Sequence, residues 1–278
     1  MQATTNNTME SKNETQENEP PKEEVKAAEP DNEVEEEIPF IDLSDYFIKP
    51  DMFDGIHILD ESCEKIDGAP NFRQISGFPV FGTGQPTEDA MVAIINKAKS
   101  GDENQKIFWF IMRQEPLVYV NGSPYAPRDP ENPHVNLELE MNISQVKTVD
   151  RHLAKVLKKR QAESGNDTIK VHKDEEFAEN PMDRIDLEDT IDVKNIKDLE
   201  AVYEYCRDKC NVDLVVVRIP VQEDQMPAEH IDVIIDALKD EPASTPCVFN
   251  CQMGKGRTTL GMIVASLVKE ISITKELR

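Results

Sequence analysis

The sequence lacks the features of several large classes of protein. It has no apolar run near the roughly 18 residues that a membrane-spanning helix needs, and no signal or transit segment at its N-terminus. Bases are scarce: 278 residues carry 31 Lys and Arg against 55 Asp and Glu, a formal net charge of −24. This unpatterned negative field repels the phosphates of nucleic acid. We therefore expect a cytosolic protein with no transmembrane segment and no nucleic-acid partner.

The first 38 residues lack Leu, Phe, Trp and Tyr altogether. They hold 12 acids and 3 bases, so they carry −9 of the charge and the remaining 240 residues carry −15. Such a segment cannot bury enough apolar surface to offset its ordering entropy. We predict a disordered acidic tail over residues 1–38 and a folded domain over residues 39–278.

Cysteine pairs are also missing. The five cysteines include no Cys-x-x-Cys, and without a secretion signal the reduced state is the default. Cys206 and Cys210 are four residues apart on an expected helix and could form half a metal site. No matching pair of Cys or His exists elsewhere, so we favour ordinary packing for both and expect no metal and no cofactor.

What the sequence does contain is an alternation of strands and helices, which is typical of a parallel sheet with helix cover. Continuous apolar runs indicate buried strands, and apolar residues at helical spacing indicate helices. Strands are expected at 78–81, 107–112, 214–221 and 247–251. Helices are expected from Pro86 onward, with Met91, Ile94, Ile95 and Ala98 on the packed face, and at 145–163, 196–209, 227–239 and 258–271.

The motif that carries chemistry spans residues 248–259, Val-Phe-Asn-Cys-Gln-Met-Gly-Lys-Gly-Arg-Thr-Thr. It follows an expected strand and opens an expected helix, whose N-terminus is a site of positive potential. Cys251 is the candidate nucleophile, since this position favours the thiolate that would attack phosphorus. The guanidinium of Arg257 can hold two phosphoryl oxygens, and the Thr258 hydroxyl can assist the sulfur when it leaves. A buried cysteine beside a Gly-rich turn is the alternative.

The residues between Cys251 and Arg257 are the candidate phosphate-binding loop: Gln252, Met253, Gly254, Lys255 and Gly256. The two glycines let backbone N–H groups turn inward, where they can bind phosphoryl oxygens. The reaction also needs a general acid, which we expect in the loop after the preceding strand, within residues 218–227. Asp224 is the first candidate and Glu223 the second, although both can equally be solvated loop acids.

Residues 251–258 resemble the loop of cysteine-dependent phosphatases, Cys-x5-Arg-Ser/Thr. Asn71-Phe72-Arg73, Gly84-Gln85-Pro86 and residues 113–124 are similar to segments of the cysteine phytase-like phosphatases of the protein tyrosine phosphatase superfamily. The resemblance spans about residues 65–271. It implies a tyrosine-phosphatase-like α/β fold, a parallel sheet flanked by helices, acting on a phosphate-bearing substrate. Arg113 would line the pocket mouth, or equally form a salt bridge.

The sequence departs from this family in two ways. Asn250 stands where the family usually has His, and Asn cannot become cationic. The chain also ends 21 residues past Arg257, where the family packs further helices, so we expect a C-terminally incomplete fold with an apolar face left uncovered. Residues 254–257, which include Lys255, resemble the Gly-Lys-Gly-Arg loop of lipid phosphatases that act on phosphoinositides. Lys255 can also simply face solvent.

Three hypotheses follow. The first is a cytosolic phosphatase that acts on phosphotyrosine, a phosphoinositide or an inositol phosphate through a phospho-cysteine intermediate. The second is a pseudophosphatase that binds phosphate, turns over poorly and works as a signalling adaptor with protein partners. The third is a purely structural role.

Overall fold

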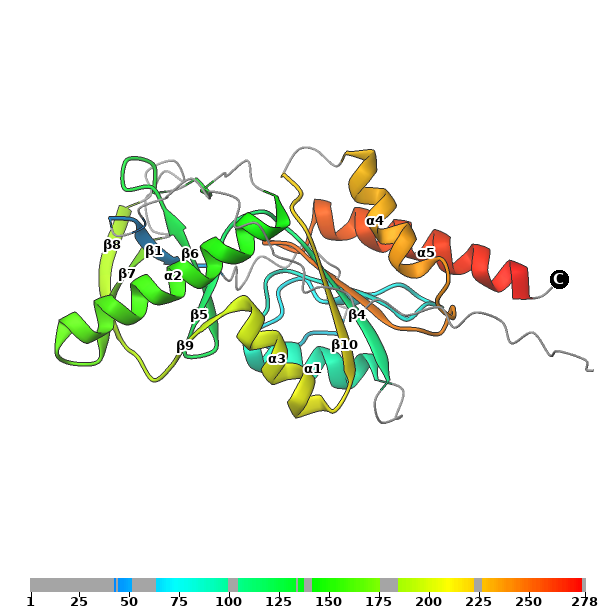
Figure 1. Cartoon of the computed structure of the whole chain (residues 1–278), viewed down its shortest axis with the longest axis horizontal. Helices are drawn as coiled ribbons and strands as arrows, with labels where there is room; N and C mark the ends of the chain where they lie inside the picture. Colours follow the sequence, from blue (N-terminus) through cyan, green and yellow to red (C-terminus); the bar gives the residue numbers. More distant parts are fainter. Residues whose placement is uncertain are drawn as a thin grey trace, which may run out of the picture. The chain divides into compact units, whose positions relative to one another are not determined.

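Figure 1 shows the chain as a computed structural model. The structure describes residues 43, 45–51, 64–99, 105–133, 135–137, 142–175, 185–222 and 227–276. The predicted acidic tail lies outside these residues. Within them the strands are β1 (Phe47–Pro50), β2 (Arg73–Gln74), β3 (Val80–Thr83), β4 (Lys106–Met112), β5 (Val118–Val120), β6 (Ser123–Arg128), β7 (Thr168–Glu175), β8 (Ile185–Asp192), β9 (Ile196–Asp198), β10 (Asp213–Ile219) and β11 (Cys247–Asn250). The helices are α1 (Glu88–Ala98), α2 (Ile143–Ser164), α3 (Leu199–Cys210), α4 (Ala228–Leu238) and α5 (Gly256–Glu276).

The central sheet has five strands in the order β10-β4-β11-β3-β2. The pairs β10–β4, β4–β11 and β11–β3 are parallel, and β2 pairs antiparallel with β3 at one edge. Parallel strands covered on both faces read as continuous apolar runs, which is the pattern of β4. The predicted parallel sheet flanked by helices is therefore confirmed.

Side chains of β4 alternate between two cores. Ile107, Trp109 and Ile111 belong to the cluster that includes α1 and α3. Phe108, Phe110 and Met112 belong to the cluster that includes α4 and α5. Figure 1 shows these two pairs of helices on opposite sides of the sheet. The period of two residues along a strand thus gives the sheet two buried faces.

Beside the central sheet lies a second, four-stranded sheet in the order β1-β6-β5-β9, which the sequence analysis did not predict. α2 packs its buried residues, including Val149, Leu153 and Leu157, in the same cluster as Val118 and Val120 of this sheet. β7 and β8 form a separate antiparallel pair. The short antiparallel strands lack the long apolar runs that identified the central sheet.

One expected helix overlaps a strand of the second sheet. The expected helix over 196–209 begins only at Leu199, because residues 196–198 form β9 and pair with β5. The side chain of Asp198 accepts a hydrogen bond from the N–H of Ala201 and caps α3. The helical periodicity continued across a strand that is only three residues long.

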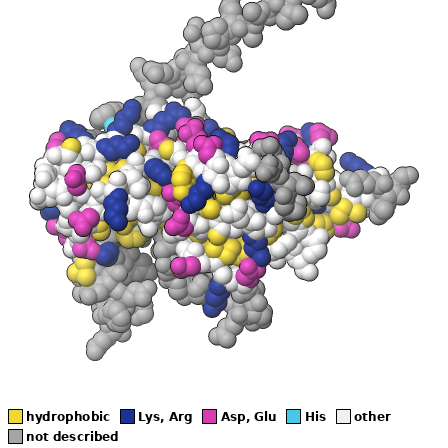
Figure 2. All heavy atoms as spheres, turned by 90° about the horizontal axis from the view of Figure 1, so that it is seen from below, with side chains coloured by type: hydrophobic (Ala, Val, Ile, Leu, Met, Phe, Trp, Pro, Cys, Tyr) yellow, Lys and Arg dark blue, Asp and Glu magenta, His cyan; other side chains and the backbone are white. Residues whose placement is uncertain are grey.

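α5 carries an exposed apolar stripe. Leu260, Ile263, Leu267 and Ile271 are 37–61% exposed. Figure 2 shows one face of the molecule, where hydrophobic side chains lie among charged side chains of both signs.

Candidate active site

The candidate nucleophile lies between β11 and α5. Cys251 directly follows the strand and is 3% exposed. Its Sγ accepts a hydrogen bond from the N–H of Gly254 at 3.3 Å, and the hydroxyl of Thr258 lies 3.1 Å away. Both groups can donate a hydrogen bond to the sulfur. The structure therefore brings Cys251, Gly254 and Thr258 together at the N-terminus of α5.

The two glycines of the loop differ in what they do. Gly254 has φ +77°, and a Cβ atom there would lie 2.4 Å from the backbone nitrogen of Gly84. The tight contact between two backbones and the left-handed conformation both require glycine. A Cβ atom at Gly256 would meet nothing within 4 Å, so this glycine opens α5 without any such requirement.

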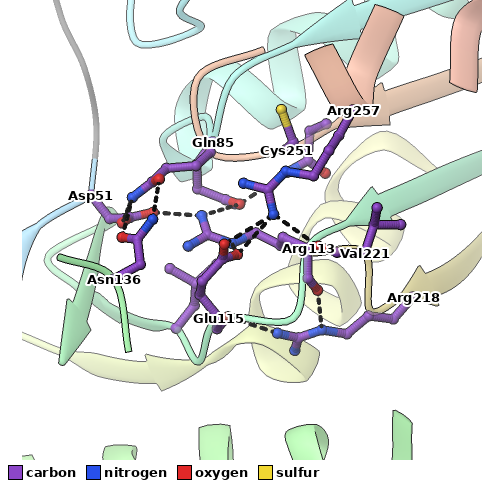
Figure 3. Close-up of polar contacts among 12 residues, drawn as sticks. Asp51, Gln85, Arg113, Glu115, Asn136, Arg218, Val221, Cys251 and Arg257 are labelled. Carbon is purple, nitrogen blue, oxygen red and sulfur yellow. Dashed lines mark hydrogen bonds and ion pairs between the residues drawn. The ribbon is translucent and has the colours of Figure 1, made fainter. Parts of the chain in front are cut away.

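Arg257 is held from one side of its guanidinium. Its Nη1 donates to Oε1 and Oε2 of Glu115 at 2.9 and 3.3 Å and to the carbonyl of Val221 at 3.0 Å. In the described part of the chain, Nε and Nη2 have no hydrogen-bond partner. Figure 3 shows Arg257 with Cys251 on one side and Glu115 on the other. Two donors are thus available to bind phosphoryl oxygens.

Arg113 lies in a buried ion-pair network. It is fully buried, with Nη1 2.5 Å from Oδ2 of Asp51 and Nε 3.1 Å from Oε2 of Glu115. Burial alone would lower the pKa of Arg113, but these two acids raise it overall. The geometry fits the salt-bridge alternative. Its Nη2 has no partner among the described residues.

Asp51 joins this network to the phosphate loop. It accepts from Nη2 of Arg128 at 3.3 Å and from Nε2 of Gln252 at 2.8 Å. Burial alone would raise the pKa of Asp51, but Arg113 and Arg128 bring it below its ordinary value. Gln252 also exchanges two hydrogen bonds with the amide of Asn136, at 2.7 and 2.9 Å. The side chain of Gln252 therefore supports the loop, and only its backbone remains a candidate for binding substrate.

The side-chain amide of Asn250 forms hydrogen bonds with residues other than Cys251. Its Oδ1 accepts from Nε1 of Trp109 at 2.8 Å, and its Nδ2 donates to Oε1 of Gln85 at 2.9 Å. Gln85 in turn donates to the hydroxyl of Tyr119 at 2.8 Å. Asn250 thus links β11 to β4 and to the turn before α1.

The remaining predicted site residues are two residues of the loop and the two candidate general acids. Met253 and Lys255 are half-buried, and the ammonium group of Lys255 has no hydrogen-bond or ion-pair partner among the described residues. The two candidate general acids, Glu223 and Asp224, lie outside the described residues. Val221, three residues before Asp224, is bound to Arg257, so the loop that carries these acids starts at the site.

Sequence reasoning missed several residues of this site, notably Asp51, Glu115 and Asn136. They come from three separate segments, and no spacing pattern links them to Cys251. Glu115 could have been predicted, because it follows β4 at the carboxyl edge of the sheet, where β11 also ends.

The described residues include three other cysteines, Cys206, Cys210 and Cys247. Burial raises the pKa of Cys206 and of Cys247 to about 12 in each case, and Cys206 and Cys210 lie on α3 and share a core cluster with residues of α1. Across the described ranges, no three His, Cys, Asp or Glu side chains cluster in a way that could hold a metal ion. No helix in these ranges is long and apolar enough to cross a membrane.

The loop thus brings together Cys251, an inward N–H group, Arg257 and the N-terminus of α5. Comparison with known proteins agrees: the family model for PTP-like phytase, described as inositol hexakisphosphate, matches residues 110–269. The chain belongs to this family.

Among curated relatives, the chain is 30% identical to paladin of Xenopus tropicalis over 248 residues, which are 80% of this chain and 26% of that protein. It is 28% identical to paladin of Homo sapiens over 247 residues, which are 80% of this chain and 27% of that one. The chain therefore spans about a quarter of the length of these relatives.

Solved structures share the fold. A PTP-like phytase from Bdellovibrio bacteriovorus aligns with a TM-score of 0.51 and 16% identity, over 80% of this chain and 68% of that chain. A PTP-like myo-inositol phosphatase from Mitsuokella multacida, in complex with myo-inositol-(1,3,4,5)-tetrakisphosphate, aligns with a TM-score of 0.50 and 13% identity, over 81% of this chain and 36% of that chain.

Proposed function

We propose that residues 39–278 form a cysteine-dependent phosphatase that hydrolyses phosphomonoesters in the cytosol. The observation that carries this proposal is the position of Cys251 Sγ, which lies 3.3 Å from the N–H of Gly254 and 3.1 Å from the hydroxyl of Thr258. A cysteine that only filled space in the core would not need two donors directed at its sulfur. Membership of the PTP-like phytase family supports the same chemistry.

The reaction has two steps. In the first, the thiolate of Cys251 attacks phosphorus, an S–P bond forms and the bond to the leaving oxygen breaks. Nε and Nη2 of Arg257, together with the backbone N–H groups of the loop, bind the phosphoryl oxygens as charge shifts onto them. In the second, water attacks phosphorus and the S–P bond breaks, returning the electron pair to sulfur. The hydroxyl of Thr258 stabilises that leaving thiolate.

A general acid gives a proton to the leaving oxygen in the first step. The same side chain then acts as a base and removes a proton from water in the second step. We assign this role to Asp224, with Glu223 as the second candidate. The contact between Arg257 and the carbonyl of Val221 supports the assignment, because it anchors the start of their loop beside the clamp.

The substrate class is a phosphomonoester of a phosphotyrosine protein, a phosphoinositide or an inositol phosphate. Lys255 favours a multiply phosphorylated substrate, since its ammonium group has no partner among the described residues and adds positive charge to the loop. The Mitsuokella multacida neighbour, whose structure contains an inositol tetrakisphosphate, supports this class.

A second candidate function is a pseudophosphatase that binds phosphate groups and acts as a signalling adaptor. The observation in its favour is Asn250, whose amide donates to Gln85 and cannot supply a cationic partner to Cys251. A less stabilised thiolate would attack phosphorus slowly while the loop still bound phosphate.

The test measures phosphate release from inositol hexakisphosphate, a phosphoinositide panel and a phosphotyrosine peptide, with Cys251→Ser alongside. Release by the wild type that is lost in Cys251→Ser supports the enzyme. Binding of inorganic phosphate without release supports the adaptor. Release that survives in Cys251→Ser would contradict the assignment of the nucleophile.

A further inference from the structure

Three consecutive carbonyl groups of the phosphate loop accept hydrogen bonds from outside the loop. The carbonyl of Gln252 accepts from the N–H of Gln85 at 2.8 Å. The carbonyl of Met253 accepts from Nδ2 of Asn71 at 2.8 Å, and that of Gly254 accepts from Nη1 of Arg73 at 2.6 Å. The loop is therefore held on its outer side by two segments that are far away in sequence.

These contacts determine which way the N–H groups of the loop point. In a planar trans peptide, the carbonyl of one residue and the N–H of the next point in opposite directions. When the carbonyls of residues 252, 253 and 254 point outward, the N–H groups of residues 253, 254 and 255 point inward. The 3.3 Å contact from the N–H of Gly254 to Cys251 Sγ shows this direction for the middle group. A row of inward N–H groups is an anion-binding arrangement.

Asn71 and Arg73 are themselves well placed for this work. Asn71 is buried and has φ +54°, a left-handed conformation that asparagine tolerates. Arg73 Nη1 also donates to the carbonyl of Asn71 at 3.0 Å, and its Nη2 donates to the hydroxyl of Thr259 at 2.8 Å. That hydroxyl lies 2.7 Å from the carbonyl of Lys255. One guanidinium thus links the loop to the first turn of α5.

We propose that Asn71 and Arg73 are positioning residues of the phosphate loop. Their side chains hold the carbonyls of Met253 and Gly254 outward, so that the following N–H groups face the phosphoryl site. They act through the loop backbone and do not touch the reacting atoms. Their effect on turnover rests on the proposed function, whereas their effect on anion binding does not.

The test uses tungstate, a tetrahedral oxyanion, as the probe. Tungstate affinity is measured by calorimetry on the full chain for the wild type, Asn71→Asp, Arg73→Met and Arg73→Lys. Asn71→Asp keeps the size of the side chain and removes its donor. We expect affinity to fall about tenfold to a hundredfold in Asn71→Asp and Arg73→Met, the scale of losing a charge-assisted or buried hydrogen bond. Arg73→Lys should recover part of the loss, because it keeps one donor.

Gln74→Ala is the matched control. Gln74 lies beside Arg73 and donates to the carbonyl of Phe78, which is not part of the loop. This variant should bind tungstate like the wild type. Melting temperatures measured on all variants separate a loss of loop geometry from a loss of fold.

The outcomes are distinct. Unchanged tungstate affinity in both Asn71→Asp and Arg73→Met would overturn the proposal, as would a wild type that binds no tungstate. A loss matched in Gln74→Ala, or one that only follows the melting temperature, would also overturn it by showing a merely structural role. If the wild type releases no phosphate but its variants lose tungstate as expected, the proposed enzyme fails and this inference stands.

Discussion

Glu115 accepts both of its short contacts to Arg257 from the same nitrogen, Nη1, at 2.9 and 3.3 Å. Its Oε2 also accepts from Nε of Arg113 at 3.1 Å. A single buried carboxylate therefore holds two arginines, and it directs the remaining donors of Arg257 away from the ion-pair network. The orientation of Arg257, the proposed phosphoryl clamp, depends on a residue 142 positions away in the sequence.

Glu115→Gln should weaken this hold while keeping the size of the side chain. Since a hydrogen bond to a charged group contributes about 1.5–3 kcal/mol, we expect kcat/KM to fall about tenfold to a hundredfold. Steady-state kinetics on the best substrate of the panel measure it. Glu131→Gln, an exposed acid of the same type, is the control. Equal kcat/KM in wild type and Glu115→Gln would show that Arg257 does not need this partner.

Thr258→Val should slow the second step of the reaction more than the first. The hydroxyl lies 3.1 Å from Cys251 Sγ, and its loss removes a donor to the leaving thiolate. We expect a burst of leaving group followed by slow turnover, with phosphorylated enzyme accumulating. Rapid-quench kinetics with mass spectrometry measure both. A variant that turns over slowly without a burst would place the role of Thr258 in the first step instead.

Asp224→Asn should reduce activity most on substrates with poor leaving groups. A general acid matters more when the departing oxygen is strongly basic, so we expect a larger loss with an alkyl phosphate than with p-nitrophenyl phosphate, by about tenfold or more. Glu223→Gln is the matched variant and should show little difference between the two substrates. The reverse result would assign the proton to Glu223.

Gly254→Ala and Gly256→Ala should differ sharply in their affinity for tungstate. A Cβ atom at Gly254 would lie 2.4 Å from backbone, and φ is +77°, whereas Gly256 has open space. We expect tungstate binding to fall at least tenfold in Gly254→Ala, through a strain of about 1–3 kcal/mol, and to change little in Gly256→Ala. Similar affinities in the two variants would mean that the loop adapts to the added methyl group.

Asp51→Asn should destabilise the fold in a way that depends on pH. The pKa of Asp51 is below its ordinary value in the folded chain. Its carboxylate therefore stabilises the fold fully above the ordinary aspartate pKa of about 3.9, and this contribution is lost as pH falls through the lower folded-state value. At neutral pH, removing one partner of a buried ion pair should cost about 3–5 kcal/mol.

Urea unfolding at neutral and acidic pH measures the Asp51 effect. The difference in the free energy of unfolding between the wild type and Asp51→Asn should shrink as the pH falls below about 4, the ordinary pKa of aspartate. Asp67→Asn, an exposed aspartate, should show little change at either pH. A difference that stays constant with pH would rule out ionised Asp51 as the source of the stability.

Local patterns in the sequence predicted the central part of this fold. The continuous apolar run of 107–112 indicated β4, and Met91, Ile94, Ile95 and Ala98 indicated the buried face of α1. Cys251, Gly254 and Thr258 lie within one short segment at the start of α5, so their proximity could be predicted from spacing alone. Their roles in catalysis remain predictions.

Features that depend on distant segments could not be predicted in this way. β5 and β6 form a local hairpin, but β1 and β9 join it only through pairing across long stretches of chain. Asp51 reaches the site only through the tertiary fold, because an ion pair leaves no periodic signal in the sequence. Arg113 illustrates the limit: the sequence placed it at the site, but its full burial and its two acidic partners come from packing.

The most direct test of the central claim is to trap the phosphorylated enzyme. Wild type and Cys251→Ser are mixed with radiolabelled phosphomonoester, quenched in acid within milliseconds and mapped by proteolysis. The account predicts a phosphoryl group on the peptide that contains Cys251 in the wild type and none in the variant. Hydrolysis of the substrate with no label on that peptide, or with label on another residue, would contradict it.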